Sequence, residues 1–472
     1  MPVDPEILAL VPEGCRVNWN EKMKTFYVYK SQYVYVPEKK RGKEIRTSVG
    51  TIKNGKFKYS KNYLAQQALT SLNQKKAEKT QTVTQSNEKL ATQVQETITD
   101  KRQIGKVVYP LDYVFLVAFL SALSGRTSCV QIADFWKHNH PALSEIFPDF
   151  PNQYISHDTV RRLLMLVEPS EFQTLYKKLV APLIYKFHQR IVAVDGQAVR
   201  ASKSAKVKTG KYVLSFFDTE NGVVLGQKLI GEKENEITHA ADMVEGLDLH
   251  GCVVTADALN TQTKFANALI KKGADYCLAV KENHKELYLD LQLAFLDVTE
   301  TRTKKVQRPQ SVKHGRIENR DYSVLPAAVL SPKHFNKWPG LDEGCIVRTV
   351  TKSTKKTTGQ ASELARYYIC SLNFDNPHIT EQIARAIRRH WAIENELHYV
   401  LDVDFNQDRT QCKNANYIQN RTVLNKAALA IIRNVQKQEI ESTGKEPMSV
   451  KRYMEKFSVL DLALEVLPDA IK

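Results

Sequence analysis

Two short apolar runs that each end in an aspartate constrain the fold of this chain more than any other feature. Residues 191–195 read IVAVD, and residues 252–257 read CVVTAD. Short runs rich in valine and isoleucine, bounded by polar residues, are typical of buried β-strands. Function in an open α/β sheet gathers at the carboxyl ends of the strands, so both carboxylates are expected at one edge of the sheet.

The segments around these runs predict an α/β fold with a mixed sheet. The expected elements are, in order, strands at 191–195, 212–218 and 223–230, a helix at 236–247, a strand at 252–257, a helix at 261–272 and a strand at 276–280. Asn221-Gly222 between the second and third strands is a hairpin signal. Strands that are followed by helices imply parallel neighbours, whereas the hairpin joins two antiparallel strands. Together they predict a mixed sheet.

The whole chain is expected to divide into five parts. They are a small basic β-rich module at 1–61, a polar linker or helix at 62–105, an all-helical domain at 106–190, a catalytic domain at 191–436 and a C-terminal tail at 437–472. The catalytic domain is expected to carry a β-rich insertion at about 285–365 and a long helix at 379–403.

The charge of the chain points to a polyanionic partner. The 472 residues include 68 Lys and Arg against 52 Asp and Glu, a net charge of +16. Residues 21–61 alone hold 12 Lys and Arg against three Glu. Such an excess most often serves nucleic acid. No apolar run is long enough to span a bilayer, and the seven scattered cysteines favour reduced thiols in a cytoplasm.

A metal site is expected where the two aspartates meet. Asp195 and Asp257 would repel each other on neighbouring strands unless a cation lies between them, and Mg²⁺ prefers such oxygen ligands. Glu394 is the candidate for a third acid, because it lies on the expected helix among basic residues. Two ions held this way activate water in phosphodiester displacement. Taken singly, each acid has a structural alternative as a turn former or an exposed ion pair.

With these residues in place, the chain resembles the DDE transposases of bacterial insertion sequences, in the branch that includes the H-repeat-associated proteins. The resemblance covers about 110–436 and rests on the phrases AVDGQAVR at 193–200, KENEI at 233–237, VTADA at 254–258, YCLAVKEN at 276–283, HGRIE at 314–318, HWAIENELH at 390–398 and LDVDF at 401–405.

The resemblance implies a ribonuclease-H-like core and a cut-and-paste DNA transposase. Such an enzyme cleaves strands at transposon ends and transfers them into target DNA. By the same resemblance, the basic β-rich module at 1–61 is the candidate for DNA-end recognition. Asp195, Asp257 and Glu394 would be the catalytic, metal-binding triad, with Mg²⁺ as the cofactor and Mn²⁺ as a substitute. The partners would be double-stranded DNA and a second copy of the chain in the synaptic complex. The protein would act in the bacterial cytoplasm, at the nucleoid.

Further residues are candidates for DNA contacts or for support of the triad. The DNA candidates are Arg388, Arg389, His390, Trp391, Lys281, Arg316, Arg200, Lys39, Lys40 and Arg41. Asn395 and His398 are expected to contact the metal-binding acids rather than the metal itself, and so to hold those acids in position. The alternatives are core packing for Trp391, a solvated surface for Lys281 and a buried, satisfied ring for His398.

Two other functions fit the same pattern. One is a domesticated, catalytically silent, sequence-specific DNA-binding protein. The other is a structure-selective nuclease of the same fold. Terminal inverted repeats beside the gene would distinguish the transposase from both.

Overall fold

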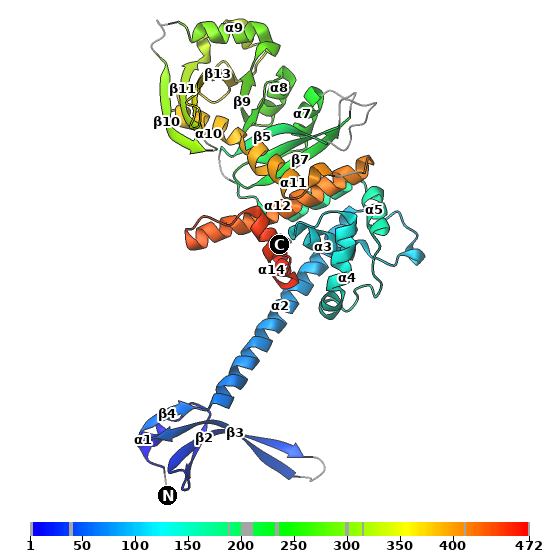
Figure 1. Ribbon diagram of the computed structural model, residues 1–472, viewed down its shortest axis with the longest axis vertical. Helices are drawn as coiled ribbons and strands as arrows, with labels where there is room; N and C mark the ends of the chain where they lie inside the picture. The colour runs from blue at the N-terminus through cyan, green and yellow to red at the C-terminus, as the bar shows by residue number, and fades with distance from the viewer. Residues whose placement is uncertain are drawn as a thin grey trace. The chain divides into compact units, whose positions relative to one another are not determined.

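The computed structural model describes residues 3–36, 41–186, 189–199, 211–231, 236–297, 302–313, 316–409 and 412–470. The chain forms two compact units, Met1–Thr82 and Val83–Lys472 (Figure 1). No helix in these described ranges has the length and apolarity that crossing a bilayer requires.

The first unit is built on a four-stranded antiparallel sheet. Its elements are α1 (Pro5–Leu8), β1 (Arg16–Asn20), β2 (Thr25–Val36), β3 (Arg41–Lys53) and β4 (Lys56–Tyr59), with the strands in sequence order. A two-residue turn joins β3 to β4. Asn54 and Gly55 take φ angles of 50° and 69° there, as a type I′ turn requires. Helix α2 (Lys61–Thr97) begins in this unit and ends in the second.

A layer of helices forms the largest apolar core of the second unit. It contains α3 (Leu111–Leu123), α4 (Cys129–Ile146), α5 (His157–Leu166), α6 (Pro169–Val180), α12 (Ala415–Thr443), α13 (Val450–Lys456) and α14 (Leu460–Ala470). Helix α5 begins at His157, because the Ser156 side chain accepts a hydrogen bond from the Thr159 amide. The described part of the expected tail at 437–472 is not a loose end, because Tyr453 and Phe457 are buried in this core.

A nine-stranded mixed sheet lies beside the helical layer (Figure 1). Its spatial order is β10-β11-β12-β13-β9-β8-β5-β6-β7. The strands are β5 (Ile191–Ala198), β6 (Tyr212–Asp218), β7 (Val223–Ile230), β8 (Val253–Ala256), β9 (Asp275–Val280), β10 (Lys304–Lys313), β11 (Arg316–Pro326), β12 (Cys345–Lys355) and β13 (Ala361–Cys370). Among the described strands, the parallel pairings are those of β5 with β8 and of β8 with β9. The predicted mixed α/β sheet is therefore confirmed.

Helices cover both faces of this sheet. One face packs on α7 (Glu236–Glu245), α8 (Thr263–Lys271) and α9 (Lys285–Ala294), and the other packs on α10 (Ile379–His390) and α12. Successive side chains of a strand point to opposite faces. Val192 and Val194 of β5 accordingly lie on the α7–α8 side, whereas Ile191 and Ala193 lie on the α10–α12 side.

Two expected elements differ from the structure. The expected helix at 379–403 is divided, because α10 is followed by a π-helical segment at Ile393–His398 and then by α11 (Tyr399–Val403). Such π segments occur often at functional sites. The first strand does not end at Asp195. It runs on to Ala198, because β6 continues to pair with it beyond the end of β8.

Candidate active site

Asp195 and Asp257 lie side by side at the end of a parallel strand pair. The pairing of β5 with β8 places Val194 beside Ala256, so the two aspartates are the next residues on neighbouring strands. Adjacent strands lie about 5 Å apart. Asn260 fixes the turn after β8, where its backbone and side-chain N–H groups each donate to Oδ1 of Asp257 at 3.1 Å.

Strand alternation turns both acids toward helix α10. On β8, Val253 belongs to the α10 side, and the Thr255 hydroxyl lies 3.1 Å from Nδ1 of His390 on that helix. Asp257 continues this alternation by two residues, as Asp195 continues that of Ile191 and Ala193. The sequence pattern therefore dictates on which face of the sheet the site forms.

A cavity of about 250 Å³ joins the two aspartates to Glu394. The Glu394 side chain comes from the π-helical segment, immediately after α10. Asp195, Asp257 and Glu394 all line this cavity. The structure thus brings together three acids that lie as far as 199 positions apart in the sequence.

Basic and aromatic side chains complete the cavity wall. Lys281, His390 and Trp391, all expected near DNA, line it. So does Arg366, to which the sequence analysis gave no role. The Arg366 guanidinium carbon lies 5.5 Å from the centre of the Trp391 ring, within the range of a cation–π contact. Arg366 reaches the site because β13 pairs with β9, which places Tyr367 beside Val280 and hence Arg366 beside Lys281.

His398 lies behind Asp195. Its Nδ1 atom is 3.6 Å from Oδ2 of Asp195, and burial lowers the pKa of His398 to about 3. The buried Gln197 side chain donates to the His398 carbonyl at 3.2 Å and to Oδ1 of Asp402 at 2.9 Å. These contacts hold the π-helical segment against β5.

His390 is the second imidazole at the site. Burial lowers its pKa, although the negative charge of Asp257 acts in the opposite direction. A neutral ring follows, with Nδ1 beside the Thr255 hydroxyl. His390 is therefore suited to shape the cavity or to exchange a hydrogen bond, rather than to supply a fixed positive charge.

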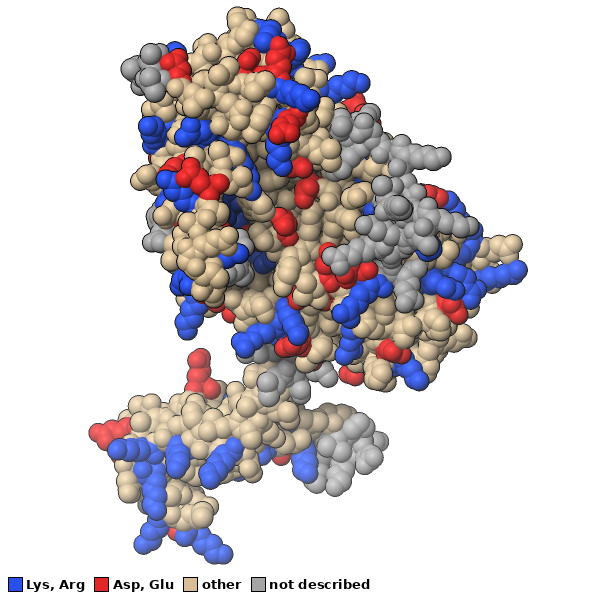
Figure 2. All heavy atoms as spheres, turned by 45° about the horizontal axis from the view of Figure 1, so that its top comes forward, with Lys and Arg blue, Asp and Glu red and all other residues tan. Residues whose placement is uncertain are grey.

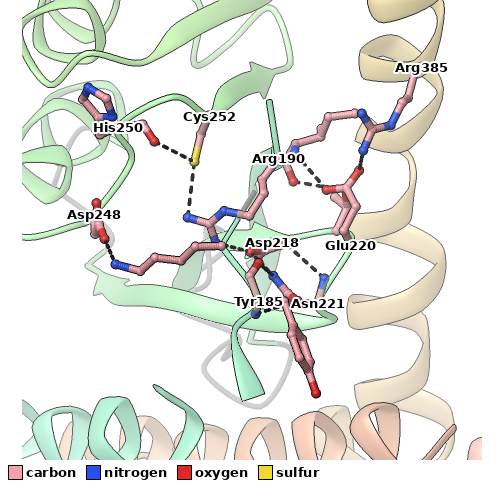
Figure 3. Close-up of polar contacts among 12 residues, drawn as sticks. Tyr185, Arg190, Asp218, Glu220, Asn221, Asp248, His250, Cys252 and Arg385 are labelled. Carbon is pink, nitrogen blue, oxygen red and sulfur yellow. Dashed lines mark hydrogen bonds and ion pairs between the residues drawn. The ribbon is translucent and has the colours of Figure 1, made fainter. Parts of the chain in front are cut away.

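Polar contacts at the start of β5, at the other end of this strand from Asp195, hold helix α10 in place (Figure 3). Arg385 of α10 donates to Oε1 of Glu220 at 2.7 Å, and Oε2 of Glu220 accepts from the Ile191 amide at 2.8 Å. Beneath them, Arg190 pairs with the fully buried Asp218 at 2.6 Å. The same turn that ends β6 therefore ties α10 to the start of β5.

Arg389 does not lie at the cavity. Its guanidinium donates to the carbonyl of Thr219 and, at 3.0 Å, to Oε1 of Glu396. The structure thus gives it an internal partner on each side, as a link between the β6–β7 turn and the π-helical segment.

The other expected contact residues lie apart from the cavity or outside the described side chains. Arg388 lies at the surface of α10, where partial desolvation of its guanidinium and the nearby charge of Arg320 lower its pKa. The Asn395 amide donates to the Trp391 carbonyl at 2.9 Å. Arg200, Lys39 and Lys40 lie outside the described residues, and only the backbone of Arg41 and Arg316 is described.

The donor set at the cavity suits a divalent cation. Three carboxylates are the ligand type that Mg²⁺ and related hard ions prefer. Within the described part of the chain, no three His, Cys, Asp or Glu side chains already converge as ligands. Asp195, Asp257 and Glu394 nevertheless fit such an ion, because all three line one cavity and offer carboxylate oxygens.

Comparison with known proteins adds a family to this geometry. A family model described as a transposase DDE domain matches residues 186–431, and a second, described as DDE_Tnp_1-associated, matches residues 92–180. The first span contains all three cavity acids.

Individual relatives agree with the family models. The chain is 30% identical over 339 residues to "Putative transposase YncI" of Escherichia coli O157:H7, which covers 71% of this chain and 85% of that protein. It is 28% identical over 345 residues to "H repeat-associated putative transposase YhhI" of Escherichia coli K12, covering 71% and 88%. It is also 30% identical over 191 residues to "H repeat-associated putative transposase YbfD" of the same strain, covering 40% and 75%.

Proposed function

Because this chain belongs to the family of transposases with a DDE domain, we propose that it cleaves DNA strands at transposon ends and joins them to target DNA. One observation carries this proposal: Asp195, Asp257 and Glu394, from three separate segments, line a single cavity. A ribonuclease-H-like core is supported by the order of the strands. Strands β5, β6 and β7 pair antiparallel, and β8 and β9 then continue the sheet parallel to β5.

Each residue at the cavity has a role in the proposed reaction. The three acids would hold a divalent cation, Mg²⁺ with Mn²⁺ as a substitute. When bound, such an ion lowers the pKa of water and neutralises charge on phosphate oxygens. Lys281 and Arg366 would bind the non-bridging oxygens of the scissile phosphate, and the ring of Trp391 would orient Arg366. The chain would thus act through positioning and charge neutralisation.

The proposed sequence has two phosphoryl-transfer steps. Water first attacks the phosphate at the transposon end, which breaks one P–O bond and leaves a 3′-hydroxyl on the transposon strand. That hydroxyl then attacks a target phosphodiester in line, so the transposon strand is joined as a target strand is broken. Two ends must be cut together, which implies a homodimer in the synaptic complex.

The experiment that tests this function is cleavage of a labelled duplex that carries the DNA flanking the gene. It compares Mg²⁺ with EDTA, and the wild type with Asp195→Ala and Glu394→Ala. Glu381→Gln, an exposed acid in the first turn of α10, is the matched control. We expect metal-dependent nicking at the element end that both alanine variants lose and the control keeps.

The same assay separates the alternatives. Sequence-specific binding without any cleavage would identify a catalytically silent DNA-binding protein. Cleavage that ignores sequence and persists in Glu394→Ala would reject the triad and favour a different nuclease.

A further inference from the structure

The sheet of the N-terminal unit has two chemically different faces. On one face the cross-strand neighbours are apolar: Val17 lies opposite Val28, and Phe26, Ile52 and Phe57 lie in one row. Residues of α1 and Tyr63 of α2 pack against this face. It is the side on which the small core forms.

The opposite face is basic and aromatic. Arg16, Tyr29, Arg46, Lys53, Lys56 and Lys58 belong to it by strand register, and we call it the basic face. Tyr27 and Tyr29 stack on it at 5.6 Å, and the Arg46 guanidinium lies 4.8 Å from the Tyr29 ring centre. The side chains therefore form an ordered surface rather than a set of independent charges.

One carboxylate organises this face without neutralising it. Glu44 accepts hydrogen bonds from Ser31 and, at 2.9 Å, from Arg46, and lies 3.9 Å from Arg16. Hydrogen bonds from Ser31 and Arg46 lower the pKa of Glu44. Among the described side chains of the basic face, five cations therefore face one acid, Glu44; the cations are Arg16, Arg46, Lys53, Lys56 and Lys58. Figure 2 shows lysine and arginine side chains gathered along one side of this unit.

The basic face extends along the ribbon formed by β2 and β3. Tyr33 and Tyr35 continue the row of Tyr27 and Tyr29, and they are 68% and 64% exposed. Contiguous apolar side chains that stay exposed and are bordered by polar residues are typical of interaction surfaces. Hydroxyl groups on their tips can reach phosphates or base edges.

We propose that the basic face binds duplex DNA at the transposon end, an inference that rests on the proposed function. A two-stranded ribbon or sheet fits the major groove, where each base pair shows a distinct pattern of donors and acceptors. The lysines and arginines would contact phosphates, and Tyr33 and Tyr35 would reach toward the bases. The face lies in residues 16–58, outside the regions that match the family models. In this proposal the basic face recognises the transposon end, and the cavity with the three acids cleaves it.

The test measures binding by the full-length chain carrying Asp195→Asn, so that no cleavage intervenes. Fluorescence anisotropy compares a duplex of the element's terminal sequence, a scrambled duplex and the separate single strands. The variant Lys53→Gln/Lys56→Gln/Lys58→Gln removes three charges from the basic face. Lys30→Gln/Lys43→Gln/Lys61→Gln is the matched control, because Lys30 and Lys43 lie on the opposite face and Lys61 begins α2.

We expect the basic-face variant to bind the end duplex at least tenfold more weakly, and the control within threefold of the wild type. The slope of log K against log salt should become shallower by about 0.9 for each phosphate that the variant no longer neutralises. Tyr33→Ala/Tyr35→Ala, at exposed positions that do not support the core, should lower the ratio of end to scrambled affinity. Circular dichroism checks that each variant is folded.

Three outcomes would overturn the inference. The first is equal weakening of DNA binding in the triple lysine variant of the basic face and in its control. The others are tighter binding to single strands than to the duplex, and an unchanged ratio of end to scrambled affinity in both the basic-face variant and Tyr33→Ala/Tyr35→Ala. If wild-type cleavage of ends persists in such a case, the proposed function survives alone. If the wild type binds ends through this face and never cleaves them, the inference survives and the proposed catalytic function fails.

Discussion

The imidazole of His398 stands beside the carboxylate of Asp195, with Nδ1 3.6 Å from Oδ2. Burial, and then the charge of Lys426, lowers the pKa of His398 to about 3. The neighbour of this acid is therefore a neutral ring. It can turn an N–H toward the carboxylate without cancelling the negative charge that a cation would need.

The first prediction concerns this ring. His398→Leu should lower the rate of DNA cleavage about 10- to 100-fold, as is usual when a residue that supports a metal ligand is removed. His398→Asn should recover part of that rate, because its side-chain amide keeps an N–H donor beside Asp195. Steady-state kinetics should show the change in kcat with KM for DNA unchanged.

The pH dependence gives this prediction a second measurement. A group with its pKa near 3 stays deprotonated above about pH 5. The pH–rate profiles of the wild type and His398→Asn should therefore have the same shape. A wild-type step near pH 6.5 that His398→Asn removes would contradict the neutral ring.

The second prediction concerns metal removal. In EDTA, Asp257→Asn should unfold at the same temperature as the wild type or higher, because repulsion between neighbouring carboxylates is relieved. Addition of Mg²⁺ at 100 times its dissociation constant should stabilise the wild type by about 2.7 kcal/mol. Asp257→Asn should gain far less. Thermal unfolding measures both, and an equal Mg²⁺ shift in the variant would place the ion elsewhere.

Much of the sheet was predictable because its signals are local. The short apolar runs at 191–195 and 252–257 identify two buried strands, and Asn221-Gly222 identifies the hairpin. The order of three strands, helix, strand, helix and strand is present as β5 to β9. The three cavity acids followed from these strands and from the resemblance of 390–398 to the family motif.

Long-range pairing was not predictable from such signals. Nothing local in 361–370 indicates that β13 pairs with β9, so the arrival of Arg366 beside Lys281 was missed. The π-helical segment was missed as well, because its apolar spacing resembles that of an α-helix. Arg389 was expected at DNA because basic residues surround Glu394, whereas its contacts to Thr219 and Glu396 depend on the tertiary fold.

The third prediction concerns Arg366. Arg366→Gln should raise KM for DNA about tenfold and make the salt slope shallower by about 0.9, as expected when one phosphate is no longer neutralised. Arg366→Lys should retain the charge but not the planar stacking on Trp391. Its KM for DNA should therefore lie between those of the wild type and Arg366→Gln. Lys352→Gln on β12 is the control for charge alone. An equal effect of the control would assign Arg366 a general electrostatic role.

The fourth prediction concerns the buried ion pair of Arg190 and Asp218. Arg190→Met should destabilise the protein by about 3–5 kcal/mol, because the Asp218 charge is left buried without its partner. Arg190→Met/Asp218→Asn should be less destabilised than the single variant, since no unpaired charge remains. Urea unfolding of the wild type, Arg190→Met, Asp218→Asn and the double variant measures this. Additive destabilisation in the double variant would show that the two charges do not interact.

The last prediction concerns Lys426, a lysine of α12 buried beneath the sheet. Its Nζ donates to Ser215 Oγ at 2.8 Å and to Gln227 Oε1 at 2.6 Å, and Ser215 lies opposite Asp195 on the neighbouring strand. No ion pair to Lys426 is found among the described side chains. Burial lowers its pKa from 10.5 to about 7.

The sign of the pH effect follows from this shift. Between about pH 7 and 10.5 the unfolded chain binds one proton that the folded chain does not, so stability rises with pH there. The contribution is at most about 1.4 kcal/mol per pH unit. Below pH 7 both states are protonated, and the full cost of the buried charge is present.

Lys426→Met removes this titration while keeping a side chain of similar length. Its stability relative to the wild type should therefore be greatest near pH 6.5 and should fall steadily toward pH 9.5, in urea unfolding measured at several pH values. Lys445→Met, at an exposed position after α12, should show no such trend. A difference between Lys426→Met and the wild type that does not change with pH would mean that the lysine is charged in the folded protein throughout this range. The buried position would then have to be supported by polar groups other than Ser215 and Gln227.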